Sequence, residues 1–185
     1  MIAGLRLASK TKSVQKLSVQ ALAKISGYSR ATFFRRYGKF YDFAIKAYHQ
    51  TCFASVLVYE KRLVECRFAR SQFVDFTGSF FYGANVCIPN EIVADFWQSA
   101  EWSHREFHPH LVQVAAVMAK YLRSNPSTAS ISFTDEEILE VVFALDMDIL
   151  MSRLDRRSDF PSERQYKRVQ AFLEGFLLMH DQSAN

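Results

Sequence analysis

Cationic and hydroxyl side chains gather in one short stretch near the start of the sequence, from Gly27 to Phe40. The stretch reads Gly-Tyr-Ser-Arg-Ala-Thr-Phe-Phe-Arg-Arg-Tyr-Gly-Lys-Phe, and it contains four cations and no acid. Guanidinium and ammonium groups bind phosphates, and an Arg can also pair with guanine in a DNA groove. The stretch therefore predicts contact with an anionic partner. The alternative is a solvated rim on a helix that packs through its aromatic side chains. Phe33 and Tyr37 are four residues apart and are expected to pack inward.

The charges of the chain are divided unequally along the sequence. Residues 1–50 contain ten Lys or Arg and one acid, Asp42, which gives a formal charge of +9. The whole chain of 185 residues has a net charge of +4, so the remaining residues carry −5. A basic segment joined to a mildly acidic body predicts that the segment meets a polyanion and the body does not.

A second cluster contains side chains that can bind a metal: His104 and His108 lie one helical turn apart, and Glu101 lies one turn before them. Such a trio could hold a divalent metal. However, Arg105 stands where a zinc protease has its general base, and Pro109 fits a helix only at a kink or in its first turn. We therefore predict no metal, and expect polar residues that line a loop or a ligand cavity, with a metal site as the alternative.

The sequence contains no pattern typical of an enzyme, such as a nucleophile elbow or a Gly-rich phosphate loop. Cys52, Cys66 and Cys87 are odd in number and lack the Cys-x-x-Cys spacing of a zinc site, which indicates reduced thiols. No apolar run reaches the roughly 18 residues of a membrane helix, and residues 1–27 lack the apolar centre of a signal peptide. We predict a cytoplasmic protein that is not an enzyme and has no cofactor.

The elements that position these residues are predicted to be helices. Gly and Pro are scarce, 6 and 4 in the chain, and the hairpin signals Asn-Gly and Asp-Gly are absent. Ser18 and Ser29 can cap two short helices that are separated by Gly27. Thr134 and Ser162, each followed by acidic residues, are expected to start two later helices. Further helices are expected at residues 1–10, 40–65, 68–84, 90–99, 103–123, 135–157 and 162–180. The fold class is all-α.

The last two of these helices carry apolar residues on more than one face. In the first of them, Ile138 and Val142 mark one face, whereas Leu139 and Phe143 mark another. A helix that is apolar on two faces must be covered twice. A second copy of the same pair would cover both faces in a four-helix dimer interface, with Gly175 allowing close backbone approach. Deep burial within one chain is the alternative.

From Leu17 to Tyr37 the sequence resembles the DNA-binding head of the tetracycline-repressor-like (TetR) transcriptional regulators. The head of that family reads roughly as a hydroxyl residue, Val, two variable residues, Ile-Ala, then Gly-Val-Ser, Thr-Leu-Tyr and an aromatic residue. The corresponding segments follow in the same order and without a gap: Ser18-Val19-Gln20-Ala21-Leu22-Ala23, Gly27-Tyr28-Ser29 and Thr32-Phe33-Phe34. The chain length, the long fourth helix and the two apolar terminal helices are also similar.

The resemblance implies DNA contacts from the residues that match the family's motif: Ser18, Ser29, Arg30, Ala31, Thr32, Phe34, Arg35 and Lys39. Arg30 and Thr32, at the start of the recognition helix, would contact bases or phosphates, whereas Arg35 and Lys39 would hold phosphates. This sequence departs from the family's pattern at two of these positions. The recognition-helix Tyr corresponds to Phe34, and the Lys at the start of the fourth helix corresponds to Phe40. The resemblance therefore implies a head with fewer phosphate anchors than is usual in that family.

On this resemblance we expect a helix-turn-helix domain in residues 1–45 and a helical regulatory and dimerisation domain in residues 46–185. The expected partners are operator DNA, a second copy of the chain and a small-molecule effector that releases a repressor from DNA. Effector contacts are expected from Phe80, Phe81, Trp97, Trp102 and His104, although a plain hydrophobic core also explains the aromatic side chains. The alternative function is a ligand- or metal-binding protein of the same fold with weakened or lost operator binding.

Overall fold

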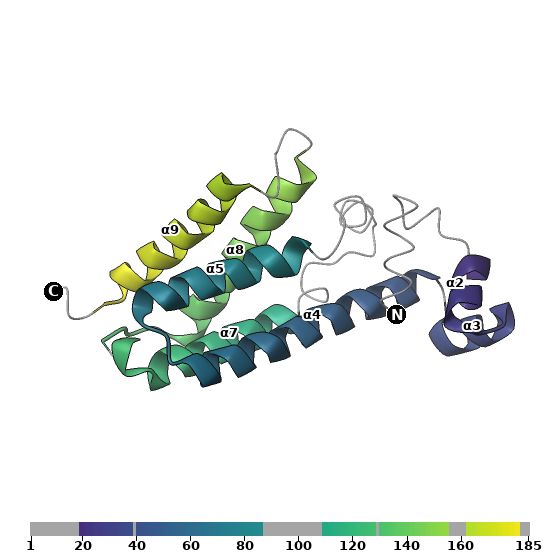
Figure 1. Ribbon diagram of the computed structural model, residues 1–185, viewed down its shortest axis with the longest axis horizontal. Helices are drawn as coiled ribbons and strands as arrows, with labels where there is room; N and C mark the ends of the chain where they lie inside the picture. The colour runs from purple at the N-terminus through teal and green to yellow at the C-terminus, as the bar shows by residue number, and fades with distance from the viewer. Residues whose placement is uncertain (1–18, 39, 87–108, 129, 156–161, 182–185) are drawn as a thin grey trace. The chain divides into compact units, whose positions relative to one another are not determined.

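The computed structural model describes residues 19–38, 40–86, 109–128, 130–155 and 162–181, and every regular element within them is helical (Figure 1). The elements, in chain order, are α2 (Val19–Ser26), α3 (Arg30–Tyr37), α4 (Phe40–Cys66), α5 (Arg70–Val86), α7 (Pro109–Ser124), the 3-10 helix η1 (Pro126–Thr128), α8 (Asp135–Leu154) and α9 (Glu163–Met179). The predicted all-α class is confirmed. The helices expected at residues 1–10 and 90–99 lie outside the described residues.

The chain divides into two compact units. Among the described residues, those up to Ala54 belong to the first unit and those from Ser55 onward belong to the second. The domain boundary expected after residue 45 and this division both lie within α4. The extent of each domain stays a prediction.

Hydroxyl side chains start three of the helices, as the sequence predicts. Ser29 caps α3 and Ser162 caps α9, each by accepting a hydrogen bond from a first-turn amide. At α8 the cap is reciprocal: the hydroxyl of Thr134 accepts from the amide of Glu137 at 3.2 Å, and the carboxylate of Glu137 accepts from the amide of Thr134 at 2.7 Å. Each capping hydrogen bond satisfies an amide that has no partner inside its helix.

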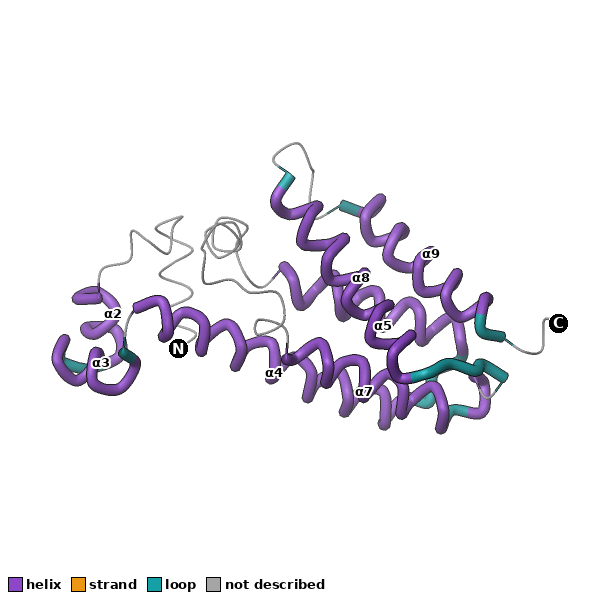
Figure 2. Tube along the Cα trace, turned by 180° about the vertical axis from the view of Figure 1, so that it is seen from behind, coloured by secondary structure: helices purple, strands orange, loops and turns teal. Residues whose placement is uncertain are grey.

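The core of the second unit lies between α5, α7, α8, α9 and the second half of α4. Within this unit α7 packs on α8, and α5 packs on α9 and α8. In Figures 1 and 2 the second half of α4 and α7 run side by side. The largest completely buried side chains of this core are Tyr59, Phe73, Leu63, Met118, Leu122, Ile138, Leu145, Leu173 and Leu177. Burial of each such side chain contributes about 1.5–3 kcal/mol, so this layer dominates the stability of the unit.

The residues that follow α9 are fastened to two distant segments of the second unit. Asp181 forms an ion pair with Arg70 at the start of α5. It also pairs with Ile131 in an isolated antiparallel bridge, and the amide of Ser132 donates to the carbonyl of His180 at 2.9 Å. The segment before α8, the start of α5 and the end of α9 are therefore held together.

Within the described residues, no helix combines the length and the apolar character that crossing a membrane requires.

Candidate nucleic-acid interface

A tight turn joins α2 to α3. The amide of Tyr28 donates to the carbonyl of Ala23 at 2.8 Å, and the amide of Gly27 donates to the carbonyl of Lys24 at 3.3 Å. This pair of hydrogen bonds is the Schellman motif, which needs a left-handed residue just after the helix. Gly27 supplies it, with φ of 72°, at no steric cost. The sequence expectation that Gly27 ends this helix is confirmed.

The first turn of α3 is held by its own side chains. The hydroxyl of Ser29 accepts from the amide of Thr32 at 3.1 Å and lies 2.9 Å from the hydroxyl of Thr32. Ser29, Arg30 and Ala31 remain exposed, and Thr32 is half-buried. The start of the helix therefore presents one long cation and short side chains at the surface.

Phe33 anchors α3 to the first unit. Its side chain is 0% exposed, and its ring centroid lies 5.1 Å from those of both Tyr37 and Phe43. Tyr37 and Phe43 also contact each other, at 4.9 Å between centroids. This three-ring cluster fixes the rotation of α3 about its axis, because Phe33 and Tyr37 lie one turn apart on the same face. The inward orientation predicted for both residues is confirmed.

An exposed face of α3 consists of Arg30, Phe34, Ala31 and Arg35. At about 100° per residue these positions span an arc of about 140°, whose centre lies about 110° around the helix from that of Phe33 and Tyr37. Phe34 lies inside this arc, between Arg30 and Arg35, and its side chain is 42% exposed. The face is thus cationic at both edges and apolar in the middle.

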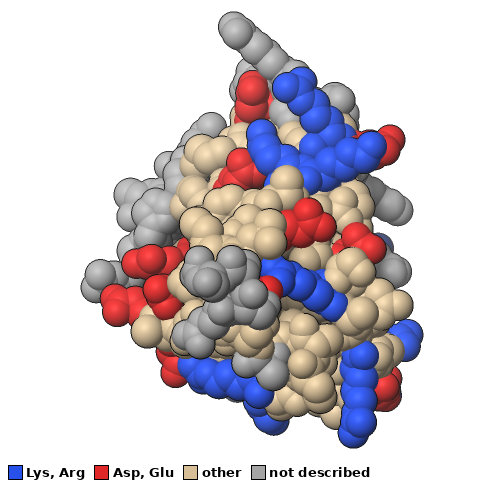
Figure 3. Space-filling model, turned by 90° about the vertical axis from the view of Figure 1, so that its left-hand side faces the viewer, with Lys and Arg blue, Asp and Glu red and all other residues tan. Residues whose placement is uncertain are grey.

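The electrostatic character of this segment has a single sign. Residues 19–38 contain Lys24, Arg30, Arg35 and Arg36, all exposed, and no Asp or Glu. By contrast, in the view of Figure 3, toward the side that lies on the left in Figure 1, Lys and Arg side chains alternate with Asp and Glu. Four cations on a short helical hairpin attract an extended anion, whereas a surface of mixed sign does not.

Arg36 has a role that the sequence does not reveal. Its guanidinium donates to the hydroxyl of Tyr28 at 2.8 Å and lies over the Tyr28 ring, 5.4 Å from the centroid. The contact ties the turn to the last turn of α3. Neither helical periodicity nor capping rules pair residues eight apart, and the only available signal is a large aromatic residue placed directly after the turn glycine.

Other predicted site residues lie elsewhere. Phe81 is buried in the core of the second unit, and Phe80 stacks on Tyr59 with the two centroids 4.4 Å apart. Ser18, Lys39, Trp97, Trp102, His104 and His108 lie outside the described residues. Among the residues that are described, no group of three or more His, Cys, Asp or Glu is arranged to hold a metal ion.

The chain was compared with family models, curated proteins and solved structures. No family model, no curated protein and no solved structure matches the chain.

Proposed function

We propose that the protein is a dimeric DNA-binding transcriptional regulator, which acts as a repressor and leaves its operator when a small molecule binds. The observation that carries the proposal is the exposed face of α3. This face places Arg30 and Arg35 on a helix that is fixed by a buried phenylalanine, within a segment that has no acidic side chain. The resemblance of this segment to the TetR head supports the same conclusion.

In the proposed complex, α2 and α3 form a helix-turn-helix and the first turn of α3 enters the major groove. Arg30 pairs with the O6 and N7 atoms of a guanine, and the methyl group of Ala31 can contact a thymine methyl. Arg35, one turn further along, neutralises a phosphate and fixes the register of the helix on the duplex. Arg36 is occupied by Tyr28 and stabilises the turn.

Apolar side chains left at the surface of α8 and α9 support a homodimer. Phe172 is 47% exposed and Met179 is 77% exposed, and both lie with Gly175 on one face of α9; Met151 of α8 is exposed as well. A methyl group at Gly175 would meet no atom within 4 Å, so packing inside one chain does not explain a glycine there. Close approach of a second helix does explain it, because glycine otherwise costs about 0.5–1 kcal/mol in a helix.

The second apolar face of α8 is partly covered within the chain. Leu150 is buried, whereas Leu139, Phe143 and Met147 are half-buried. Packing inside the chain thus accounts for part of this face, and the proposed dimer would cover the exposed remainder, with Met151 and Phe172 near its centre.

Release from DNA follows from the dimer. Two recognition helices enter successive major grooves only when they lie about 34 Å apart. An effector that binds more tightly to a conformation with another spacing shifts the population toward that conformation and lowers affinity for the operator.

Titration of duplex DNA over a salt series tests the proposal. Fragments selected from genomic DNA should bind saturably, and log K should fall by about 0.9 per log unit of salt for each phosphate neutralised. Arg35→Ala should reduce that slope by about 1, and Arg30→Ala should weaken binding by about 1–3 kcal/mol and relax specificity. Arg62→Ala, an exposed cation on α4 outside the head, is the matched control and should bind as the unaltered protein does.

The same titration separates a second candidate function. Phe34 offers no hydroxyl to a phosphate, which favours a helical ligand-binding protein that has lost its operator. If no duplex binds at low salt, the regulator proposal is wrong and the second candidate replaces it.

A further inference from the structure

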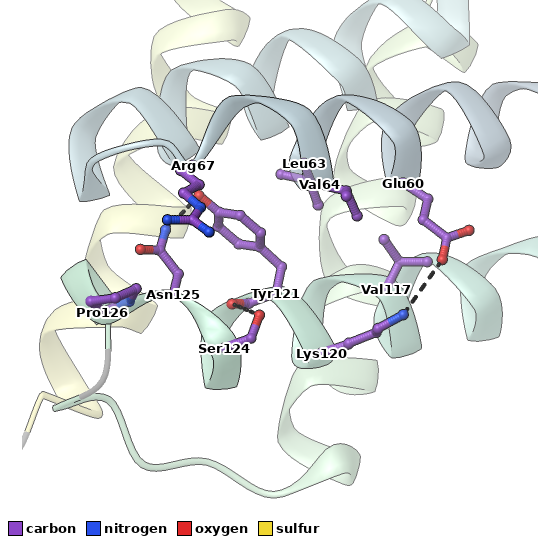
Figure 4. A pocket seen from close by; sticks show the side chains of 10 residues that line it. All are labelled: Glu60, Leu63, Val64, Arg67, Val117, Lys120, Tyr121, Ser124, Asn125 and Pro126. Atoms are coloured by element: carbon purple, nitrogen blue, oxygen red, sulfur yellow. Dashed lines mark hydrogen bonds and ion pairs between the residues drawn. The ribbon is translucent and has the colours of Figure 1, made fainter.

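A cavity of about 350 Å³ lies between the second half of α4 and α7, entirely within the second unit (Figure 4). Its apolar wall is formed by Leu63 and Val64 of α4, Val117 of α7, and Pro126. Val64 is 68% exposed although it lines this hollow. Small-molecule sites have volumes of about 300–1,000 Å³ and mostly apolar walls, so both the size and the lining suit a small ligand.

One end of the cavity is pre-formed by a hydrogen-bond network around the carbonyl of Phe68. The hydroxyl of Tyr121 donates to this carbonyl at 3.1 Å, and the side-chain amide of Asn125 donates to it at 2.7 Å. Ser127 donates to both the Phe68 carbonyl and the Asn125 side chain. Burial raises the pKa of Tyr121, so its hydroxyl stays protonated and the network stays neutral. These groups are already paired, and they give the site a fixed shape.

The charged side chains that line the cavity are Glu60, Arg67 and Lys120, with a formal sum of +1. Lys120 and Glu60 lie 3.9 Å apart and largely offset each other. Within the described part of the chain, Arg67 makes no ion pair. In Figure 4 its side chain lies next to the ring of Tyr121 and the side chain of Asn125. One unneutralised guanidinium therefore borders an apolar hollow.

The backbone at Arg67 is strained. Its φ of 35° is the only positive value at a non-glycine residue among the described ones. The position follows the last residue of α4, where a left-handed residue is normally glycine. A side chain in this backbone conformation is unfavourable, and such strain concentrates at binding sites. An Arg in this position is therefore better explained by what its guanidinium binds than by the turn it occupies.

We infer that this cavity binds a small organic monoanion, a carboxylate with an apolar body. The carboxylate accepts two parallel hydrogen bonds from Arg67, and the apolar body packs against Leu63, Val64 and Val117. α4 and α7 both end beside the cavity, and the negative ends of their dipoles oppose an anion with about half a charge each. The last carbonyls of α7 accept hydrogen bonds from Ser124, Asn125 and Thr128. The carboxylate contacts the guanidinium of Arg67 directly, whereas the dipole charges are screened by solvent at the surface.

The inference names the chemical class of the effector and rests on the proposed regulator for its biological role only. Binding of the anion itself requires neither DNA nor a dimer. The site also differs from the one expected around Phe80 and Phe81, neither of which lines this cavity.

Calorimetric titration with 2-naphthoate tests the inference on the full chain. Naphthoate should bind at one site per chain and about tenfold or more tightly than 2-naphthamide, which has nearly the same shape and no charge. The cation 2-naphthylmethylamine should bind more weakly still. Equal affinities for naphthoate and naphthamide, or no binding of either, would overturn the proposed site.

Variants of Arg67 separate recognition from folding. Arg67→Gly removes the guanidinium and the strain together, so naphthoate affinity should fall at least about tenfold while the melting temperature stays equal or rises. Arg67→Gln keeps the strain and removes only the charge, and it should lose the same affinity. Naphthoate affinity that survives both changes would contradict the assignment.

Two further variants change the charge nearby. Glu60→Gln removes the acid that neutralises Lys120, so naphthoate should bind more tightly; weaker binding would contradict the charge balance given above. Arg62→Gln, on the same helix but outside the cavity lining, is the matched control and should leave the naphthoate affinity unchanged.

The naphthoate titration contains no DNA, so it tests the anion site separately from the proposed function. If the chain binds naphthoate but no duplex DNA, the proposed regulator function is wrong and the anion site stands. If it binds duplex DNA but no naphthoate, only the anion site is wrong.

Discussion

Phe33 and Phe34 are neighbours in the sequence with opposite environments. Phe33 is completely buried, whereas Phe34 lies on the exposed face of α3, because successive residues of a helix are separated by about 100°. The sequence predicted the inward pair Phe33 and Tyr37 from their spacing alone. It did not predict the contact of Arg36 with Tyr28, because that contact depends on the turn that brings Tyr28 back over the helix.

Phe34→Tyr is expected to strengthen duplex binding. The added hydroxyl extends from an exposed ring and can donate to a phosphate oxygen, which should improve affinity by about fivefold, or about 1 kcal/mol. The duplex titration described above measures it. Thermal stability should not change, since the ring is already at the surface. Unchanged or weaker binding would show that this face of α3 does not meet the DNA backbone.

Helix starts are predicted well where a hydroxyl cap marks them. Ser29, Thr134 and Ser162 cap α3, α8 and α9 as expected. The start of α5 was expected at residue 68 and lies at Arg70. The side chain of Gln72 accepts a hydrogen bond from the amide of Ala69 at this helix start. Because no Ser or Thr stands at the capping position, the sequence gives no clear signal for it. The helix expected to reach residue 157 ends at Leu154, where neither Gly nor Pro marks the stop.

The cap of α8 should make stability depend on pH. The backbone amide of Thr134, and then its hydroxyl, lower the pKa of Glu137 below its ordinary 4.5. Because the folded-state pKa is depressed, the stabilisation is present above pH 4.5 and is lost as pH falls through the folded value.

Glu137→Gln is the matching variant, since Gln can still cap but cannot ionise. It should melt at a lower temperature than the unaltered protein at about pH 7 and at the same temperature at about pH 2. Glu140→Gln, exposed on the same helix and outside the cap, should show no such convergence. A constant difference at all pH values would contradict the role of the carboxylate.

At the scale of the whole molecule, the sequence predicted the helical class but not the cavity beside Arg67. Helical class follows from periodicity and from scarce Gly and Pro, which are local properties. The cavity is formed by side chains about sixty positions apart, such as Glu60 and Lys120, and no local pattern brings them together. The left-handed backbone at Arg67 could not be predicted from the sequence either, because glycine is the residue that normally indicates such a conformation.

Gly175→Ala is expected to separate folding from association. With no atom within 4 Å of the added methyl group, the variant should stabilise each chain by about 0.5–1 kcal/mol through helix propensity. At a close helix contact between two copies, the same methyl group should weaken the dimer. Sedimentation measures the second effect and thermal unfolding the first.

Gly83→Ala on α5 is the control, since a methyl group there also meets nothing within 4 Å. It should stabilise the chain and leave association unchanged. A Gly175→Ala protein that associates as the unaltered protein does would rule out close packing of two chains at Gly175.

The fastening of Asp181 to Arg70 and Ile131 also bears on the order in which the chain folds during synthesis. Translation delivers α5, α7 and α8 before the residues that connect their ends, and closing so long a loop gains little until its last contacts exist. The second unit can therefore complete its fold only after residue 181 has left the ribosome. Until then its nascent helices expose apolar surface, and a chaperone that binds such surface would act in this interval.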